Sequence, residues 1–317
     1  MHAHDSVASD ENIQELLNHA YDAIKNHNLE EAAEGIERAL SLDFDNSEVV
    51  TALKYVNFWR DRGRAVQEIA TGFEQAEYLV SQWRLFNHFV ERVGEASEKC
   101  LYAVRQHVFN TALERYRQLL DESFEADSEL LLRIGRCYKG KGEYDNALET
   151  LRRAASQKKD DPEIYAELAD CYAFVNEIQR SKAFFREAFF LGAHRIDLGL
   201  LESELITRLV AKLREAGYES PELEEWVPVY GVLYGVFTVK RELRSIEYGR
   251  LKQSIYALER EHSDKRGKNE LLVPRLINRY FWLIDHYLST GEDRAKIDEV
   301  LLKLRSIDPK TYEHYIT

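Results

Sequence analysis

The dipeptide Cys-Tyr occurs twice, and the interval between the two occurrences limits what this chain can fold into. Arg136-Cys137-Tyr138 is followed by Asp170-Cys171-Tyr172, and the two cysteines lie 34 residues apart. Apolar residues between them recur every three or four positions, which is the spacing of an amphipathic helix. A sequence period of about 20 to 50 residues is typical of folds in which each unit packs on its neighbours. The interval therefore predicts a stack of similar helical units.

The composition agrees with long helices. Only 5 Pro and 15 Gly occur among 317 residues, whereas a strand-rich fold needs many turn residues. Hydrophobic residues make up 44% and charged residues 31%, as in soluble folded proteins. The longest apolar stretch, Val227 to Val239, has 13 residues and is too short to cross a bilayer as a helix. We therefore expect an all-α protein without a membrane span.

The charge disfavours one class of partner. The net charge is -13, whereas nucleic-acid binders need a basic face that displaces counterions from phosphates. Residues 1–50 carry 12 acidic and 2 basic side chains, and residues 240–268 carry 9 basic and 5 acidic ones. We expect no nucleic-acid partner, and the two oppositely charged segments could steer protein partners or pair with each other.

The start of the sequence and the cysteines indicate a compartment. The first residues contain neither a basic segment nor an apolar run, so no secretory leader is expected, although a leader already removed would leave the same start. Cys100, Cys137 and Cys171 are too few and too far apart for a disulfide framework. We expect a cytoplasmic location, and we interpret Cys137 and Cys171 as small packing residues.

Two adjacent segments, 128–161 and 162–195, carry the repeat most clearly. Small residues at fixed positions allow two antiparallel helices to approach, and large residues fill the gaps between them. The matching residues are Gly135, Tyr138, Gly142, Tyr144, Ala147 and Ala154 in the first segment, and Tyr165, Leu168, Ala169, Tyr172, Phe185 and Ala188 in the second. This pattern resembles the tetratricopeptide repeat family. The resemblance implies a right-handed α-solenoid of antiparallel helix pairs, with Tyr138 and Tyr172 buried.

The resemblance also suggests how the chain is divided. Residues 1–12 are expected to form a flexible terminus and residues 13–195 the repeats. The repeat segments are 13–46, 47–92, 93–127, 128–161 and 162–195, of which 47–92 is irregular and is expected to be a hairpin with a lengthened second helix. Residues 196–317 are expected to form divergent helices. They end in a degenerate hairpin over 277–310, where Gly291 ends a helix.

In this family the first helix of each repeat lines a concave groove. Carried over by position, the resemblance gives a partner-binding groove made of Arg105, Leu132, Arg136, Lys139, Asp170 and Phe174. Such a groove would bind an acidic or amphipathic peptide or helix, because guanidinium groups pair with carboxylates and apolar contact supplies affinity. The alternative is that Arg136 pairs with Asp170 across the repeat interface and binds no partner.

A second candidate surface lies in the aromatic stretch after residue 225. Trp226, Tyr230, Tyr234 and Phe237 could form an apolar docking surface for a partner or for a second copy of the chain. The alternative is a buried helix in which Gly231 and Gly235 allow close packing. A further alternative function is a small-molecule or regulatory pocket within residues 226–287.

Catalytic and metal-binding patterns are missing from the sequence. No His-x-x-x-His or Cys-x-x-Cys pair occurs, and no phosphate-binding glycine loop or nucleophile motif is found. We therefore predict no catalytic residue, no metal site and no cofactor. The predicted function is a non-enzymatic scaffold, adaptor or assembly subunit whose partners are other proteins, with a homo-oligomer also considered.

Overall fold

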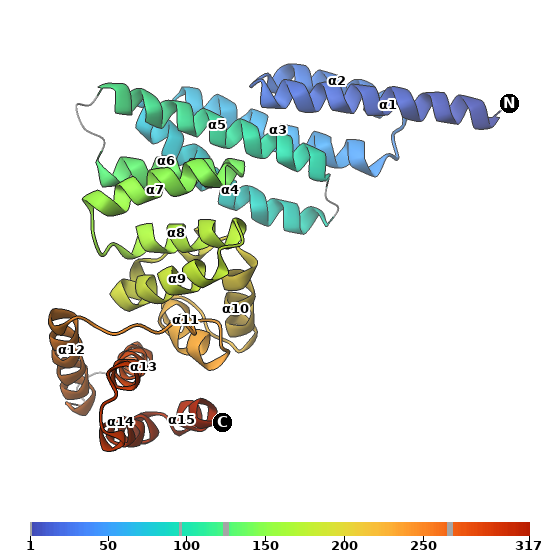
Figure 1. Ribbon diagram of the computed structural model, residues 1–317. Helices are drawn as coiled ribbons and strands as arrows, with labels where there is room; N and C mark the ends of the chain where they lie inside the picture. Colours follow the sequence, from blue (N-terminus) through green and yellow to red (C-terminus); the bar gives the residue numbers. More distant parts are fainter. Residues whose placement is uncertain (1, 95–96, 123–126, 265–268) are drawn as a thin grey trace. The chain divides into compact units, whose positions relative to one another are not determined.

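The computed structural model describes residues 2–94, 97–122, 127–264 and 269–317 (Figure 1). Over these ranges the chain forms fifteen α-helices, two short 3-10 turns and no strand. Consecutive helices pack on one another within each of two compact units, residues 1–150 and 151–317. The fold is an all-α helical solenoid. None of the helices described is long and apolar enough to span a membrane.

The first unit contains six complete helices and the start of a seventh. Helix α5 contacts α1, α3, α4 and α6, so it connects helices that are far apart in sequence. The helices are α1 (His2–Lys25), α2 (Leu29–Leu42), α3 (Ser47–Gln67), α4 (Gly72–Val93), α5 (Glu98–Glu122), α6 (Ser128–Lys141) and the first half of α7 (Tyr144–Gln157).

The second unit begins inside α7 and continues to the C-terminus. Its closest helix pair is α8 with α9, and α13 contacts α11, α12 and α14. The helices are α8 (Pro162–Phe174), α9 (Ile178–Gly192), α10 (Glu204–Glu215), α11 (Glu222–Leu233), α12 (Ser245–Ser263), α13 (Leu272–Thr290), α14 (Arg294–Ile307) and α15 (Pro309–Ile316). Residues 265–268 of the basic stretch lie outside the described ranges.

Helix ends form where local chemistry predicts them. The Asp161 carboxylate accepts hydrogen bonds from the amides of Glu163 and Ile164, at 3.0 and 3.3 Å, and Pro162 occupies the first turn of α8. Gly142 and Gly291 end α6 and α13 with positive φ angles of 82° and 66°, a conformation that glycine adopts without steric cost. The sequence places these boundaries correctly because each cap depends on neighbouring residues only.

The interior of the two clearest repeats follows the predicted pattern. Tyr138 and Tyr172 are 8% and 5% exposed, which confirms that both rings are buried. The alanines at the predicted crossing points are fully buried: Ala147, Ala154, Ala169 and Ala188. Small side chains at these positions let paired helices approach closely.

Segment 93–127 differs from the expected repeat. It contains a single helix, α5, that runs from Glu98 to Glu122, so an antiparallel pair in this segment is wrong. No glycine or proline occurs between these residues to end a helix, and the position where Gly142 ends α6 is occupied here by His107. Elsewhere, α1 begins at His2, ahead of the first expected repeat, and residues 47–92 form two long helices, α3 and α4.

Candidate functional site

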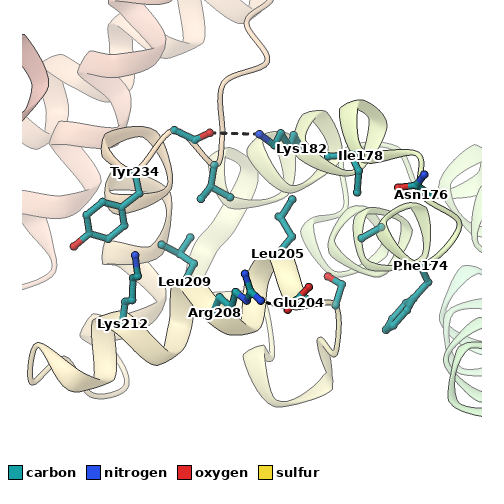
Figure 2. Close-up of a pocket in the computed structure, with 14 residues that line it drawn as sticks. Phe174, Asn176, Ile178, Lys182, Glu204, Leu205, Arg208, Leu209, Lys212 and Tyr234 are labelled. Atoms are coloured by element: carbon teal, nitrogen blue, oxygen red, sulfur yellow. Dashed lines mark hydrogen bonds and ion pairs between the residues drawn. The ribbon is translucent and has the colours of Figure 1, made fainter.

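A groove in the second unit, lined by described residues, has a volume of about 720 Å³. Its walls come from the end of α8, the first turns of α9, one face of α10 and the turn after α11. In Figure 2, Tyr234 and Lys212 lie at one end, Phe174 and Asn176 lie at the other, and Leu205 lies between them. We call this site the α8–α10 groove.

Helix α10 is fixed against α8 by a buried carboxylate. Asp170 is fully buried and accepts hydrogen bonds from the backbone amides of Glu202 and Ser203, at 2.9 and 2.8 Å. One face of α10 is buried in the core through Ile206, Leu209, Val210 and Leu213. Because both its start and its buried face are held, α10 presents Leu205, Arg208 and Lys212 to the groove in a fixed arrangement.

The rim near Tyr234 is shaped by a close contact between Gly231 and an aromatic ring. A Cβ atom on Gly231 would lie 2.2 Å from the Phe237 ring, so only glycine fits there. Gly235, with a φ of 69°, then reverses the chain. Phe237 turns inward and is 1% exposed, whereas Tyr234 remains 42% exposed on the rim.

The groove combines an apolar floor with cationic walls. Phe174, Ile178 and Leu205 supply apolar surface. Arg208 pairs with the exposed carboxylate of Glu204 on the next turn of α10. The remaining two cations are Lys182, whose Nζ lies 3.4 Å from the carbonyl oxygen of Gly235, and Lys212, whose Nζ lies 5.1 Å from the centre of the Tyr234 ring.

Several residues predicted for the groove are in the interior. Leu132 and Lys139 are only 1% and 4% exposed, so the expectation that Lys139 points away from the core is wrong. Helix α5 accounts for part of this burial: Arg105 donates a hydrogen bond to the Gly140 carbonyl, and a Cβ atom on Gly140 would lie 2.6 Å from the Phe109 ring. This face of α6 therefore packs on α5.

The other predicted groove residues have different positions. Arg136 is half-buried, and its role in binding a partner stays a prediction. Asp170 is buried and accepts hydrogen bonds from backbone amides, so its carboxylate is not accessible to a partner. Phe174 is half-buried and lines the α8–α10 groove. The other residues that line this groove are not the ones predicted to share a groove with Phe174.

The four residues of the predicted second docking surface also differ in how far they are buried. Phe237 is wrong as a surface residue, because its ring packs on Phe185 and Phe189, with ring centres 6.2 and 5.7 Å apart. Trp226 and Tyr230 are half-buried, with ring centres 5.7 Å apart, and they pack against the core. Tyr234 alone of these four lines the groove.

The α10 residues of the groove were not identified from the sequence. Leu205, Arg208 and Lys212 are spaced three and four residues apart and therefore share one side of a helix. The available signal was Leu205, one further apolar residue beside the buried stripe of α10. It carries weight only once α8 and α9 are known to lie beside α10.

The thiols and acidic clusters do not form a reactive site. All three cysteines are buried, and burial raises the pKa of the Cys100 and Cys137 thiols, which keeps them protonated. In the described ranges, no group of three or more His, Cys, Asp or Glu side chains is arranged to hold a metal ion. The groove is therefore described by its shape and charge.

Comparisons with known proteins agree with the fold. Residues 103–171 match the tetratricopeptide repeat family, a segment that includes α6, α7 and most of α8. A comparison with curated proteins gives no match. Repeats of this family are in general protein-interaction modules without catalytic activity. Residues 103–171 are therefore similar to tetratricopeptide repeats, and they lie in a chain whose described residues form packed helices.

Proposed function

We propose that this protein is a non-enzymatic scaffold that binds a short acidic and apolar segment of a partner protein in the α8–α10 groove. The observation that carries the proposal is the combination of an apolar floor with three cations and one carboxylate in a 720 Å³ groove. A net charge of -13 makes such a locally cationic groove distinctive, because acidic segments are repelled by most of the remaining surface.

The apolar floor of the groove can bury an apolar side chain of the partner, and this burial would supply much of the binding free energy. Burying one Leu- or Phe-sized side chain contributes about 1.5 to 3 kcal/mol. Affinity in protein interfaces is concentrated in a few apolar or aromatic anchors that are shielded from water. Phe174, Ile178 and Leu205 can surround one such anchor, because all three contribute to the same cavity.

The cations support selection for acidic segments. Arg208 is already paired with Glu204, whereas no carboxylate within the described ranges lies within 4.0 Å of the Lys182 or Lys212 ammonium groups. A partner carboxylate placed between them would gain two cationic neighbours. Since both lysines are near the rim, their contribution is expected to depend strongly on ionic strength.

A small-molecule ligand is the second candidate function. The groove volume lies in the range of about 300 to 1,000 Å³ that is common for ligand sites. Only Tyr234, Gly235 and Val236 of the aromatic stretch 226–287 line it, so the predicted pocket is shifted towards α8–α10. Binding of small compounds without peptide binding would favour this candidate.

Selection from a random peptide library on the intact chain tests the proposal. We expect enriched peptides to combine Leu, Ile or Phe with Asp or Glu, and to bind at least tenfold more weakly to a Lys182→Glu/Lys212→Glu variant. Arg250→Glu/Lys310→Glu is the charge-matched control, because both residues are exposed and neither lines the groove. Equal binding to the wild type and the double variant in low salt would refute the groove assignment.

A further inference from the structure

Two histidines from distant parts of the first unit meet at a single point. His27 lies in the turn between α1 and α2, and His107 lies near the middle of α5. Their Nδ1 atoms are 3.0 Å apart. The Thr111 hydroxyl oxygen lies 3.1 Å from the same Nδ1 atom of His27. The Nδ1 atom of His27 therefore has two possible electron-pair donors within 3.1 Å.

The hydrogen bonds show which lone pairs face the Nδ1 atom of His27. The Thr111 hydroxyl donates to the His107 carbonyl oxygen at 2.8 Å, so its lone pairs are free to accept from His27. A single Nδ1–H of His27 can bridge to the Thr111 oxygen and to the deprotonated Nδ1 of His107. A cation lying to one side of the line between the two Nδ1 atoms would meet both nitrogen atoms, with the Thr111 oxygen beside the His27 nitrogen.

A carboxylate is available to support the required tautomer. If Nδ1 of His27 binds a cation, its proton must move to Nε2. The Glu114 carboxylate lies 4.0 Å from that Nε2 atom. Histidines that bind metals usually donate their other ring N–H to a carboxylate or carbonyl, which orients the ring and raises its basicity. At 4.0 Å the Glu114 carboxylate does not accept a hydrogen bond from Nε2 in this structure, and it would have to move closer to take that role when the ion binds.

The distance between the two nitrogen atoms indicates the class of ion. With metal–nitrogen bonds of about 2.0 to 2.1 Å, a 3.0 Å separation corresponds to an angle of about 94° at the metal. This angle suits neighbouring positions of a square-planar or octahedral ion. A tetrahedral zinc ion would need the two nitrogen atoms about 3.3 Å apart. Square-planar or tetragonal nitrogen and oxygen ligands are typical of Cu²⁺ and Ni²⁺.

We propose that His27 and His107 bind one Ni²⁺ or Cu²⁺ ion through their Nδ1 atoms, with the Thr111 hydroxyl and water as further ligands. The ion would fasten the α1–α2 turn to α5. The sequence could not reveal this pair, because the two histidines are 80 residues apart and neither belongs to a short metal-binding motif. The site is separate from the α8–α10 groove and does not depend on the function proposed for it.

Calorimetric titration with Ni²⁺ and, separately, Cu²⁺ at neutral pH tests the proposal. The full chain is used with His2→Ala and His4→Ala, so that imidazoles near the N-terminus do not contribute. We expect one bound ion per chain for at least one metal, and a melting temperature raised by about 5 to 10 °C at a hundredfold excess over Kd. Zn²⁺ is expected to bind more weakly.

Substitutions distinguish this site from unspecific binding. His27→Asn should weaken binding at least tenfold, and asparagine tolerates the φ of 65° at this position. Glu114→Gln should weaken it about tenfold while leaving both ligands present. His19→Asn and His88→Asn are controls, because these side chains are 63% and 74% exposed. Equal affinity of the wild type and His27→Asn would overturn the proposal, as would the absence of saturable binding of either ion.

Discussion

The helix pair α8–α9 and the helices that follow it in the second unit are held together by different kinds of contact. In the pair, fully buried Ala169 and Ala188 mark the close approach of the two helices. Ion pairs join distant segments in the rest of the unit: the buried Arg186 of α9 pairs with the buried Asp285 of α13, and the half-buried Arg275 pairs with the buried Glu225 at 2.7 Å. Periodic small residues create a regular stack, whereas buried ion pairs fix a particular irregular arrangement.

This difference explains why the two regions were not equally predictable. Ala188 lies 34 residues after Ala154, and Ala169 lies 34 residues after Gly135, so these small residues can be found in the sequence without knowledge of the fold. Arg186 and Asp285 are 99 residues apart, and nothing in their local sequence indicates a partner. An ion pair that is exposed and one that is buried look the same in a sequence.

The largest effect is expected from breaking the buried pair on one side only. Asp285→Leu leaves the Arg186 guanidinium, which is 4% exposed, without its carboxylate. We expect the free energy of unfolding to fall by about 3 to 5 kcal/mol, measured by urea denaturation. The double variant Arg186→Met/Asp285→Leu should recover most of the loss, because no charge of this pair is then buried and Lys240, the other partner of Asp285, is 49% exposed and stays solvated. A single variant as stable as the wild type would show that the pair does not hold this region together.

The next effect concerns the contact between Gly231 and Phe237. Gly231→Ala should lower the free energy of unfolding by about 2 to 3 kcal/mol, because the new Cβ atom would lie 2.2 Å from the ring. Gly249→Ala in α12 is the matched control, since no atom lies within 4 Å of its Cβ position. That variant should be neutral or gain about 0.5 to 1 kcal/mol. Equal melting temperatures for the two variants would contradict the packing described here.

The regular repeat can be tested by enlarging one of its buried alanines. Ala154 on α7 is fully buried, so Ala154→Leu should cost about 1 to 3 kcal/mol and lower the melting temperature. Ala211→Leu is the control, because Ala211 is exposed on α10. If the melting curve of Ala154→Leu matches that of the wild type, the register of the repeat is wrong.

The smallest effect is a pH dependence confined to the irregular region. Burial raises the pKa of Glu247, but hydrogen bonds from Arg241 and Arg244 outweigh it and lower the pKa to about 2. The pKa is thus lower in the folded chain than in the unfolded chain. The stabilisation is complete above about pH 4.5 and is lost as the pH falls towards 2.

Because Glu247 is partly open to solvent, we expect its contribution to be only about 1 kcal/mol. Thermal melting between pH 5 and pH 2 measures it. Glu247→Gln should be less stable than the wild type at pH 5 and should show a shallower decline in acid. An identical pH profile for this variant and the wild type would mean that the Arg241 and Arg244 contacts do not stabilise the fold.

Some residues that line the α8–α10 groove can be predicted from the sequence, and others cannot. Phe174 and Tyr234 were found from the repeat position and from the aromatic stretch, respectively, and both line the groove. Lys139 and Phe237 were misplaced, because their burial depends on which helices cover them. Lys182, Arg208 and Lys212 were missed, since α10 becomes a wall of the groove only through the hydrogen bonds that Asp170 accepts.

Helix α5 has a consequence for how the first unit comes apart. In a linear array of helix pairs each unit depends only on its neighbours, so the ends can fray while the middle stays folded. Helix α5 instead contacts α1, α3, α4 and α6. Loss of this one helix removes packing partners from four others at once. Unfolding of residues 1–150 is therefore expected to be a single cooperative transition, with amide protons of α1 and α6 exchanging through the same global opening.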